Sequence, residues 1–143
     1  MQARDRTQLL AAVSAAQLIS GIAGMVVALR RRHPYDVFWM HGETEKIARD
    51  TLFRGTALSA PVSNLLLQAA LTAVVARRPS RRAQQALGAL GALWVPGYLG
   101  ERLVRQRLRP SGWESLESSL LAVAIGLAVA MAALGLGGSR RTA

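Results

Sequence analysis

The sequence predicts an all-α protein, an integral membrane four-helix bundle whose second helix extends outside the bilayer as an amphipathic stalk. Apolar residues make up 51% of the 143-residue chain, and they gather in four uncharged runs instead of the alternating stripes of a soluble domain. Arginines flank these runs, so the net charge of +10 indicates contacts with lipid headgroups and no nucleic-acid partner. The predicted spans are residues 7–29, 55–76, 83–100 and 118–139 of a single membrane domain, 1–143, with a polar loop-helix segment at 33–54.

The lengths of the runs support four crossings. A helix rises 1.5 Å per residue, so about 20 residues cross the ~30 Å hydrocarbon core. The third run is the shortest, with 18 residues, and needs its polar flanks to reach across. The first run ends at three consecutive arginines, residues 30–32, and not at a small-residue cleavage site, so we expect a retained helix. The chain has no cysteine, which excludes disulfides and thiolate metal sites.

Small residues spaced four apart predict the faces on which helices approach each other closely. These faces comprise Ala16, Ser20 and Gly24 in the first run and Ala122, Gly126 and Ala130 in the fourth. Beside the first face, Gln17 is expected to hydrogen-bond across the contact between helices.

The polar segment at 33–54 holds both histidines and four of the eight carboxylates. From Glu43 onward, opposite charges recur four residues apart, which predicts a helix that begins near Glu43 and continues unbroken into the second run. Pro61 is expected to kink this helix. Its face leads from the charged residues to Asn64 and Gln68, which should point toward protein and away from lipid.

The third run shows a similar face that continues past its end. Its members are Gly91, Trp94, Tyr98, Glu101 and Arg105, with Glu101 and Arg105 as an i,i+4 pair at the membrane boundary, and Pro96 predicts a bend. Beyond it, the Ser-x-x-Glu spacing of Ser111 and Glu114 predicts a capping box that starts the fourth helix near Gly112.

Four crossings place the first connector (residues 30–54) and the third connector (residues 101–117) on the same side of the membrane. That side receives seven of the eight carboxylates and both histidines. It also receives every aromatic residue, if Trp94 and Tyr98 are counted with the nearer half of the third run. An aromatic belt alone would form at both interfaces, so this bias predicts a site that opens toward the side of these two connectors.

The polar residues near that side are the candidate site. Those expected to bind a ligand are Arg54, Asn64, Gln68, Trp94, Tyr98 and Arg105. Those able to donate or accept protons in catalysis are Asp50, Glu101, Glu43 and His41. The spacing of His41 and Glu43 matches no metalloprotease motif, and we predict neither a metal nor another cofactor.

The favoured function is a small polytopic membrane protein that accommodates a lipophilic ligand or a partner's helix in a polar-lined intramembrane pocket. One alternative is a membrane enzyme acting on a lipid or isoprenoid-like substrate by Asp/Glu/His acid-base chemistry, so whether the chain is an enzyme stays open. Another is a structural subunit of a larger membrane complex. The expected partners are membrane lipids, a lipophilic small molecule, and a second copy or another membrane protein.

We expect the chain in a bacterial inner (plasma) membrane. Lysine and arginine number ten in the first and third connectors and eight elsewhere, so their totals hardly separate the two sides. The compact arginine turn at residues 77–82 favours cytoplasmic tails, whereas the arginine cluster at residues 30–32 favours the opposite orientation; of the two, we expect cytoplasmic tails.

Overall fold

The computed structural model describes residues 3–32, 36–37, 40–41, 56 and 58–137, and within them the chain is essentially helical. The helices are α1 (Ala3–Arg31), α3 (Val62–Arg77), α4 (Arg81–Gly100), α5 (Arg102–Arg107) and α6 (Ser115–Leu136), and a 3-10 turn, η2, covers Pro110–Gly112. Two short strands, β1 (Asp36–Val37) and β2 (Met40–His41), pair antiparallel, with Asp36 opposite His41. The prediction of an all-α chain is confirmed in this coarse form.

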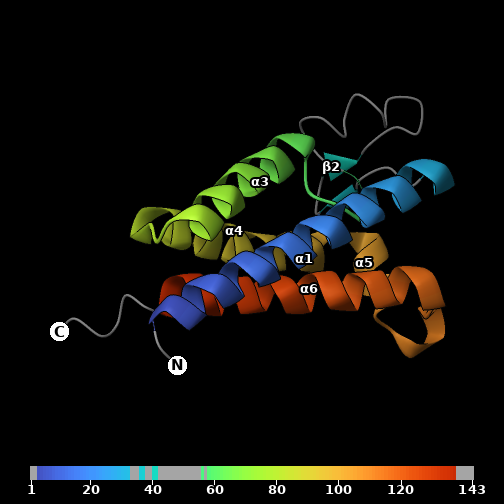
Figure 1. Ribbon diagram of the computed structural model, residues 1–143. Helices are drawn as coiled ribbons and strands as arrows, with labels where there is room; N and C mark the ends of the chain where they lie inside the picture. Colours follow the sequence, from blue (N-terminus) through green and yellow to red (C-terminus); the bar gives the residue numbers. More distant parts are fainter. Residues whose placement is uncertain (1–2, 33–35, 38–39, 42–55, 57, 138–143) are drawn as a thin grey trace.

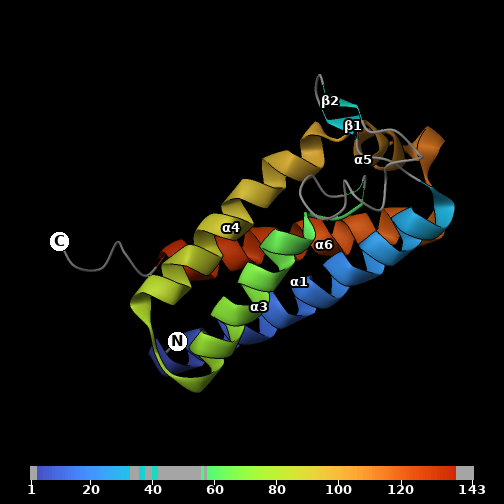
Figure 2. The ribbon, with the colours of Figure 1, turned by 90° about the horizontal axis from the view of Figure 1, so that it is seen from above.

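The four long helices form a ring in which α1 neighbours α3, α3 neighbours α4, α4 neighbours α6, and α6 closes back onto α1 (Figure 1). Figure 2 shows α3 and α4 diverging from the turn that joins them, while α5 and the β1–β2 hairpin lie at the other end of the bundle. Two of the described helices, α1 and α6, are long and apolar enough to cross a membrane, and α3 is a shorter apolar helix.

The side chains of the ring are arranged with an apolar exterior. Each long helix exposes a large aliphatic residue near its middle: Ile19 (68% exposed) on α1, Leu66 (66%) on α3, Leu93 (62%) on α4 and Val129 (50%) on α6. Several polar side chains are instead buried inside the ring, among them Ser14, Gln17 and Gln68. This arrangement is the reverse of that in most water-soluble bundles.

The predicted stalk helix is wrong at residues 56 and 58–61, which precede α3 and are not helical. Thr56 and Ser59 form an isolated antiparallel bridge, with N···O distances of 3.0 and 3.3 Å, and α3 begins only at Val62. Pro61 therefore precedes the helix and does not kink it. Proline lacks an N–H and its ring clashes with a preceding helical turn, so it is well tolerated at a helix start and poorly inside one. The proposed stalk residues 43–54 lie outside the described part of the chain.

The predicted face that joins the third run to Arg105 is also interrupted. Helix α4 ends at Gly100, Glu101 has an extended backbone (φ −72°, ψ 128°), and α5 starts a new helix at Arg102. Glu101 and Arg105 are therefore not an i,i+4 pair within one helix. Arg105 donates instead to the carbonyl oxygens of Leu99 and Gly100, at 3.0 and 2.5 Å, and so caps the end of α4.

The start of the last helix differs from the predicted capping box. Ser111 lies in the 3-10 turn, and α6 begins at Ser115 with Glu114 as its N-cap. The Glu114 carboxylate accepts from the Glu117 N–H at 2.8 Å, while the Ser118 hydroxyl accepts from the Glu114 N–H at 3.0 Å. A carboxylate at this end also suits the positive end of the helix dipole, so the two groups supply the reciprocal cap one turn later than predicted.

The glycines of α4 and α6 bring these two helices into close contact. A Cβ added to Gly135 would overlap the backbone of Gly88, and one added to Gly91 would lie 2.6 Å from the Ala128 carbonyl oxygen. The predicted seam on α6 was on the wrong face, because Ala122 and Gly126 are exposed. Helix α6 is apolar on all sides, so its composition could not distinguish the face that packs. On α1, Ser20 and Gly24 are buried as predicted, whereas Ala16 is exposed.

Replacing Gly135 by leucine should disrupt the α4–α6 contact and lower the free energy of unfolding by about 2 kcal/mol or more, because the side chain has no space. Gly126→Leu is the matched control on the same helix, since no atom lies within 4 Å of its added Cβ. Thermal unfolding of both variants in detergent, followed by circular dichroism, tests the packing. Equal stability of the two variants would contradict it.

Candidate functional site

A hydrogen-bonded network joins α1 to α3 in the middle of the bundle. The fully buried amide nitrogen of Gln68 donates to the Ser14 carbonyl at 2.9 Å, to the Ser14 hydroxyl at 3.2 Å and to Gln17 Oε1 at 3.0 Å. The Thr72 hydroxyl lies 2.7 Å from the Ser14 hydroxyl and donates to the Gln68 carbonyl, also at 2.7 Å. The predicted hydrogen bond of Gln17 across a helix contact is therefore confirmed.

This network determines which way both amides point. The Ser14 carbonyl can only accept a hydrogen bond, so the Gln68 nitrogen must face it and Gln68 Oε1 must face away. The Gln68 nitrogen also donates a hydrogen bond to Gln17 Oε1. The other end of that amide, Gln17 Nε2, therefore has no partner. An N–H donor group is thus left without an acceptor inside the bundle.

The free ends of these amides belong to a larger group of buried polar atoms that have no hydrogen-bond partner. Within the described residues these atoms are Gln17 Nε2, Ser20 Oγ, Thr56 Oγ1, Gln68 Oε1, Trp94 Nε1 and Tyr98 OH. Buried polar atoms are nearly always paired, and leaving one unpaired costs about 1–3 kcal/mol. Buried water or a bound molecule completes such groups in other proteins.

Most of these atoms come from facing helices. Trp94 and Tyr98, four residues apart on α4, are 5% and 6% exposed. The Tyr98 hydroxyl faces the Gln17 amide of α1 closely enough to interact with it electrostatically, although the two groups do not reach the geometry of a full hydrogen bond. We refer to Ser14, Gln17, Ser20, Gln68, Trp94 and Tyr98 together as the interior polar cluster. Met131 of α6 also reaches it, with its sulfur 3.8 Å from the Gln68 nitrogen, so all four long helices contribute.

The interior polar cluster is closed toward one end of the bundle. There the interior is filled by Leu10, Val75 and Leu87, which are at most 2% exposed. At that same end, Arg6 of α1 donates to the Leu134 carbonyl of α6. The cluster therefore lies between an apolar floor and the opposite end, where the first and third connectors meet.

We call that opposite end the connector rim and define it by Asp36, Glu101, Glu114 and Glu117. Glu101, 3% exposed, accepts the Asp36 N–H with both carboxylate oxygens, at 2.9 and 3.0 Å. Asp36 belongs to the first connector and Glu101 to the third, so parts of both connectors meet at one end of the bundle, and their location on one side of a membrane stays a prediction. Burial raises the pKa of Glu101 to about 7, while the hydrogen bond from Asp36 opposes this rise.

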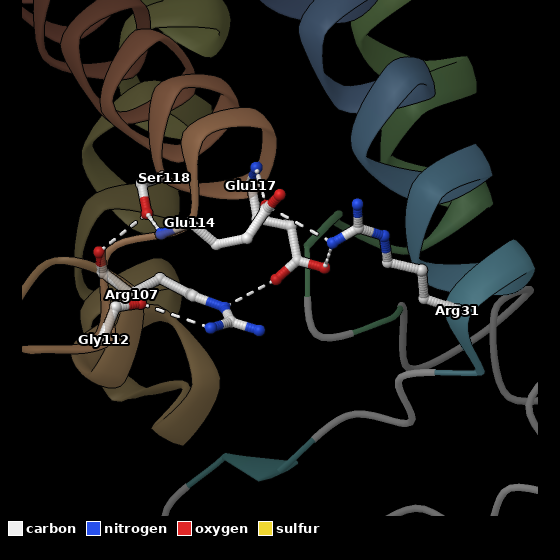
Figure 3. Close-up of polar contacts among 6 residues, drawn as sticks. All are labelled: Arg31, Arg107, Gly112, Glu114, Glu117 and Ser118. Atoms are coloured by element: carbon white, nitrogen blue, oxygen red, sulfur yellow. Dashed lines mark hydrogen bonds and ion pairs between the residues drawn. The ribbon is translucent and has the colours of Figure 1, made fainter.

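A second carboxylate at the connector rim holds three segments together (Figure 3). Glu117 is completely buried, and its oxygens accept from Arg31 of α1 and Arg107 of α5, each at 2.7 Å. Arg31 also lies 3.3 Å from Glu114, and the bonds to Glu117 and Glu114 raise the pKa of the Arg31 guanidinium. The Ser118 hydroxyl donates to the Arg107 carbonyl at 2.9 Å. We call the contacts of Glu117 with Arg31 and Arg107 the clasp, and they hold α1, α5 and α6 together at the connector rim.

The structure brings only some of the predicted site residues together. Gln68, Trp94 and Tyr98 share the interior polar cluster, and Asn64 is half-buried in the first turn of α3. Arg105 is exposed and caps α4, which places it away from the cluster interior.

The structure describes the other candidate site residues only in part. Glu43, Asp50 and Arg54 lie outside the described residues, and His41 is placed only as the backbone of β2. Glu101 is therefore the one acid-base candidate whose surroundings are known. No group of three His, Asp or Glu side chains within the described ranges could hold a metal ion.

Several residues of the site were missed by sequence reasoning. Ser14 and the free amide nitrogen of Gln17 were not assigned to a site, although Ser14, Gln17 and Gly21 follow helical spacing on the buried face of α1. Glu117 was read only as part of a polar connector. Its role depends on two arginines that are 86 and 10 residues away in the sequence, which no local pattern reveals.

The raised pKa of Glu101 predicts a pH-dependent stability. Between the ordinary value of 4.5 and about 7, the folded protein holds this proton while the unfolded chain releases it, so stability should fall as pH rises through that window. The charged groups that act on Glu101 are Asp36 and Arg105, and Arg102 lies 3.9 Å from the Asp36 carboxylate. Melting temperatures from pH 4.5 to 8 should decline in the wild type and decline less in Glu101→Gln.

Glu114→Gln is the control for this experiment. The pKa of Glu114 is lowered, chiefly by the Glu117 N–H, so its own contribution to stability is lost only below its ordinary value. This variant should keep the decline between pH 4.5 and 7. The same slope in Glu101→Gln and Glu114→Gln would show that another group is responsible.

The clasp predicts a large loss of stability when its carboxylate is neutralised. Glu117→Gln leaves Arg31 and Arg107 without their shared anion and should cost about 3 kcal/mol. Arg107→Gln should also destabilise the protein, whereas Arg109→Gln, on an exposed neighbour, should have little effect. Thermal unfolding measures all three, and an unchanged Glu117→Gln protein would rule out a stabilising clasp.

Comparison of the chain with protein-family models, with curated proteins and with solved structures gave no significant match.

Proposed function

We propose that this chain is a four-span membrane protein that holds a lipophilic ligand at the interior polar cluster, with entry from the connector rim. The observation that carries this proposal is the set of buried, unpartnered polar atoms on Gln17, Gln68, Trp94 and Tyr98, contributed by three helices. A bound polar head group would supply their missing partners, and an apolar tail would suit the surrounding aliphatic side chains.

The distribution of side chains supports a membrane location for all four long helices. The exposed side chains are apolar from Leu9 to Val26 of α1, from Ala89 to Leu99 of α4 and from Ala122 to Leu136 of α6, and those of α3 are apolar beyond Ser63 as far as Ala76. Aliphatic residues on the outside and amides within suit a hydrocarbon solvent, where polar side chains are stable only when they face protein. The bacterial inner membrane and cytoplasmic tails expected from the sequence stay predictions.

The position of the cluster favours a ligand that enters from one end. Leu10, Val75 and Leu87 fill the interior on one side, and Ala28, Leu58 and Leu121 fill it on the other, so burial alone does not distinguish the two ends. Entry from the connector rim is proposed because only short elements, the β1–β2 hairpin and the start of α5, cover that end through the contact between Asp36 and Glu101. A protein that only packed against a larger complex would have no need of unpaired amide and indole N–H groups in its interior, because each one destabilises the fold.

An enzymatic role is the second candidate, and the observation that favours it is Glu101. A carboxyl group whose pKa lies near 7 can both donate and accept a proton at neutral pH, which is the property of a general acid-base catalyst. In that case Glu101→Gln would retain a bound molecule but would no longer convert it. If the protein only binds its ligand, wild type and Glu101→Gln should both release that molecule chemically unchanged.

Native mass spectrometry of the protein in mild detergent tests the binding function. The wild type should carry a co-purified molecule at one copy per chain, and Gln68→Leu should lose it because the amide that orients the cluster is removed. Gln106→Leu is the matched control, since this glutamine is exposed on α5. A bare wild-type protein, or equal occupancy in Gln68→Leu, would contradict the proposal.

A further inference from the structure

We propose that the ligand of the interior polar cluster is an uncharged lipophile whose head group carries carbonyl oxygens, as in the quinone and long-chain ketone classes. This inference rests on the proposed function and specifies the class of ligand. It follows from three properties of the cluster. Its unpartnered atoms include more hydrogen-bond donors than acceptors, it has no charged side chain that could neutralise an ionic head group, and it reaches deep into the bundle.

The unpartnered groups of the cluster are mainly donors. Gln17 Nε2 and Trp94 Nε1 can only donate, and the hydroxyl groups of Ser20 and Tyr98 can donate or accept. Gln68 Oε1 is the single acceptor-only atom among the unpartnered atoms of the cluster. A complementary ligand must therefore present acceptors, and a carbonyl oxygen, with two lone pairs, can accept from two of these donors at once.

The charges near the cluster argue against an ionic head group. The buried polar and charged side chains of the described residues include no lysine, arginine or histidine that could neutralise a carboxylate or a phosphate. The two buried carboxylates that could attract an ammonium group are already engaged. Glu101 accepts the Asp36 N–H, and Glu117 is held by Arg31 and Arg107.

The depth of the cluster strengthens this conclusion. Gln17 stands fourteen residues from each end of α1, which runs from Ala3 to Arg31, so it lies about 21 Å from either end at 1.5 Å per residue, whereas Tyr98 is two residues from the end of α4. The cluster therefore extends from the middle of α1 toward the connector rim, and its Gln17 end is the deep one. An unpaired charge at this depth is strongly disfavoured, whereas a carbonyl group that accepts hydrogen bonds is well tolerated. The head group of the ligand should therefore be neutral.

The test uses the full chain in phosphatidylcholine nanodiscs with four probes of equal tail length: a decyl-substituted benzoquinone, decanoate, decylamine and decane. Native mass spectrometry measures the copies bound per chain. For affinity, a Trp39→Phe/Trp113→Phe variant retains Trp94 as its only tryptophan, and quenching of its emission by the benzoquinone is titrated. We expect saturable binding of one benzoquinone, which the other three probes do not displace.

Variants on this background separate specific from general partitioning. Gln17→Leu should weaken benzoquinone binding about 10-fold and Tyr98→Phe a few-fold, in keeping with the loss of one neutral hydrogen bond each, while Gln106→Leu should leave it unchanged. Equal quenching in Gln17→Leu and the parent would show that the probe only dissolves in the lipid, which overturns the proposal.

The probes also distinguish this inference from the proposed function. Binding of decanoate or decylamine at the cluster, with affinity equal to or above that of the benzoquinone, would overturn the neutral carbonyl class and leave lipophile binding in place. If none of the four probes binds and no molecule co-purifies with the wild type, both the class and the binding function fail.

Discussion

The hydrogen bond from the Gln68 amide to the Ser14 carbonyl is the interaction on which the interior of this protein depends. Because a backbone carbonyl can only accept, this one contact sets the orientation of the Gln68 amide, and through Gln17 Oε1 it sets that of a second amide. Two side chains that could each have pointed either way are thereby ordered. Their free ends, together with Trp94 and Tyr98, form a patch of unpaired groups inside an otherwise close-packed bundle.

The frame around this patch is secured by arginine side chains at both ends of α6. At its start, Arg31 and Arg107 share the Glu117 carboxylate, and at its end Arg6 donates to the last carbonyl groups. Both arrangements match the polarity of the helix, with an anion at the amino end and a cation at the carboxyl end. Between them, the contact of Gly88, Gly91 and Gly135 brings α4 against α6.

The errors of the sequence analysis share a physical origin. The unbroken stalk failed because charge pairs four residues apart were weighted above Pro61, whose missing N–H makes it a helix start. The capping box failed because Ser111 and Glu114 form a local pattern, whereas the true cap uses Ser118, whose hydroxyl is also held by the Arg107 carbonyl. The seam on α6 failed because a uniformly apolar helix contains no information about which face will pack.

The amino-acid sequence by itself determined the long apolar helices α1 and α6, the shorter apolar helix α3 and the turn between α3 and α4, because each follows from runs and spacings within short segments. It also identified Gln68, Trp94 and Tyr98 as site candidates, since polar and aromatic groups in apolar runs are individually conspicuous. Only the tertiary structure decided that Ser14 and Gln17 belong with them and that Glu117 joins three segments. Those contacts join residues far apart in the chain, and hydrogen-bond partners at that separation depend on how the helices pack.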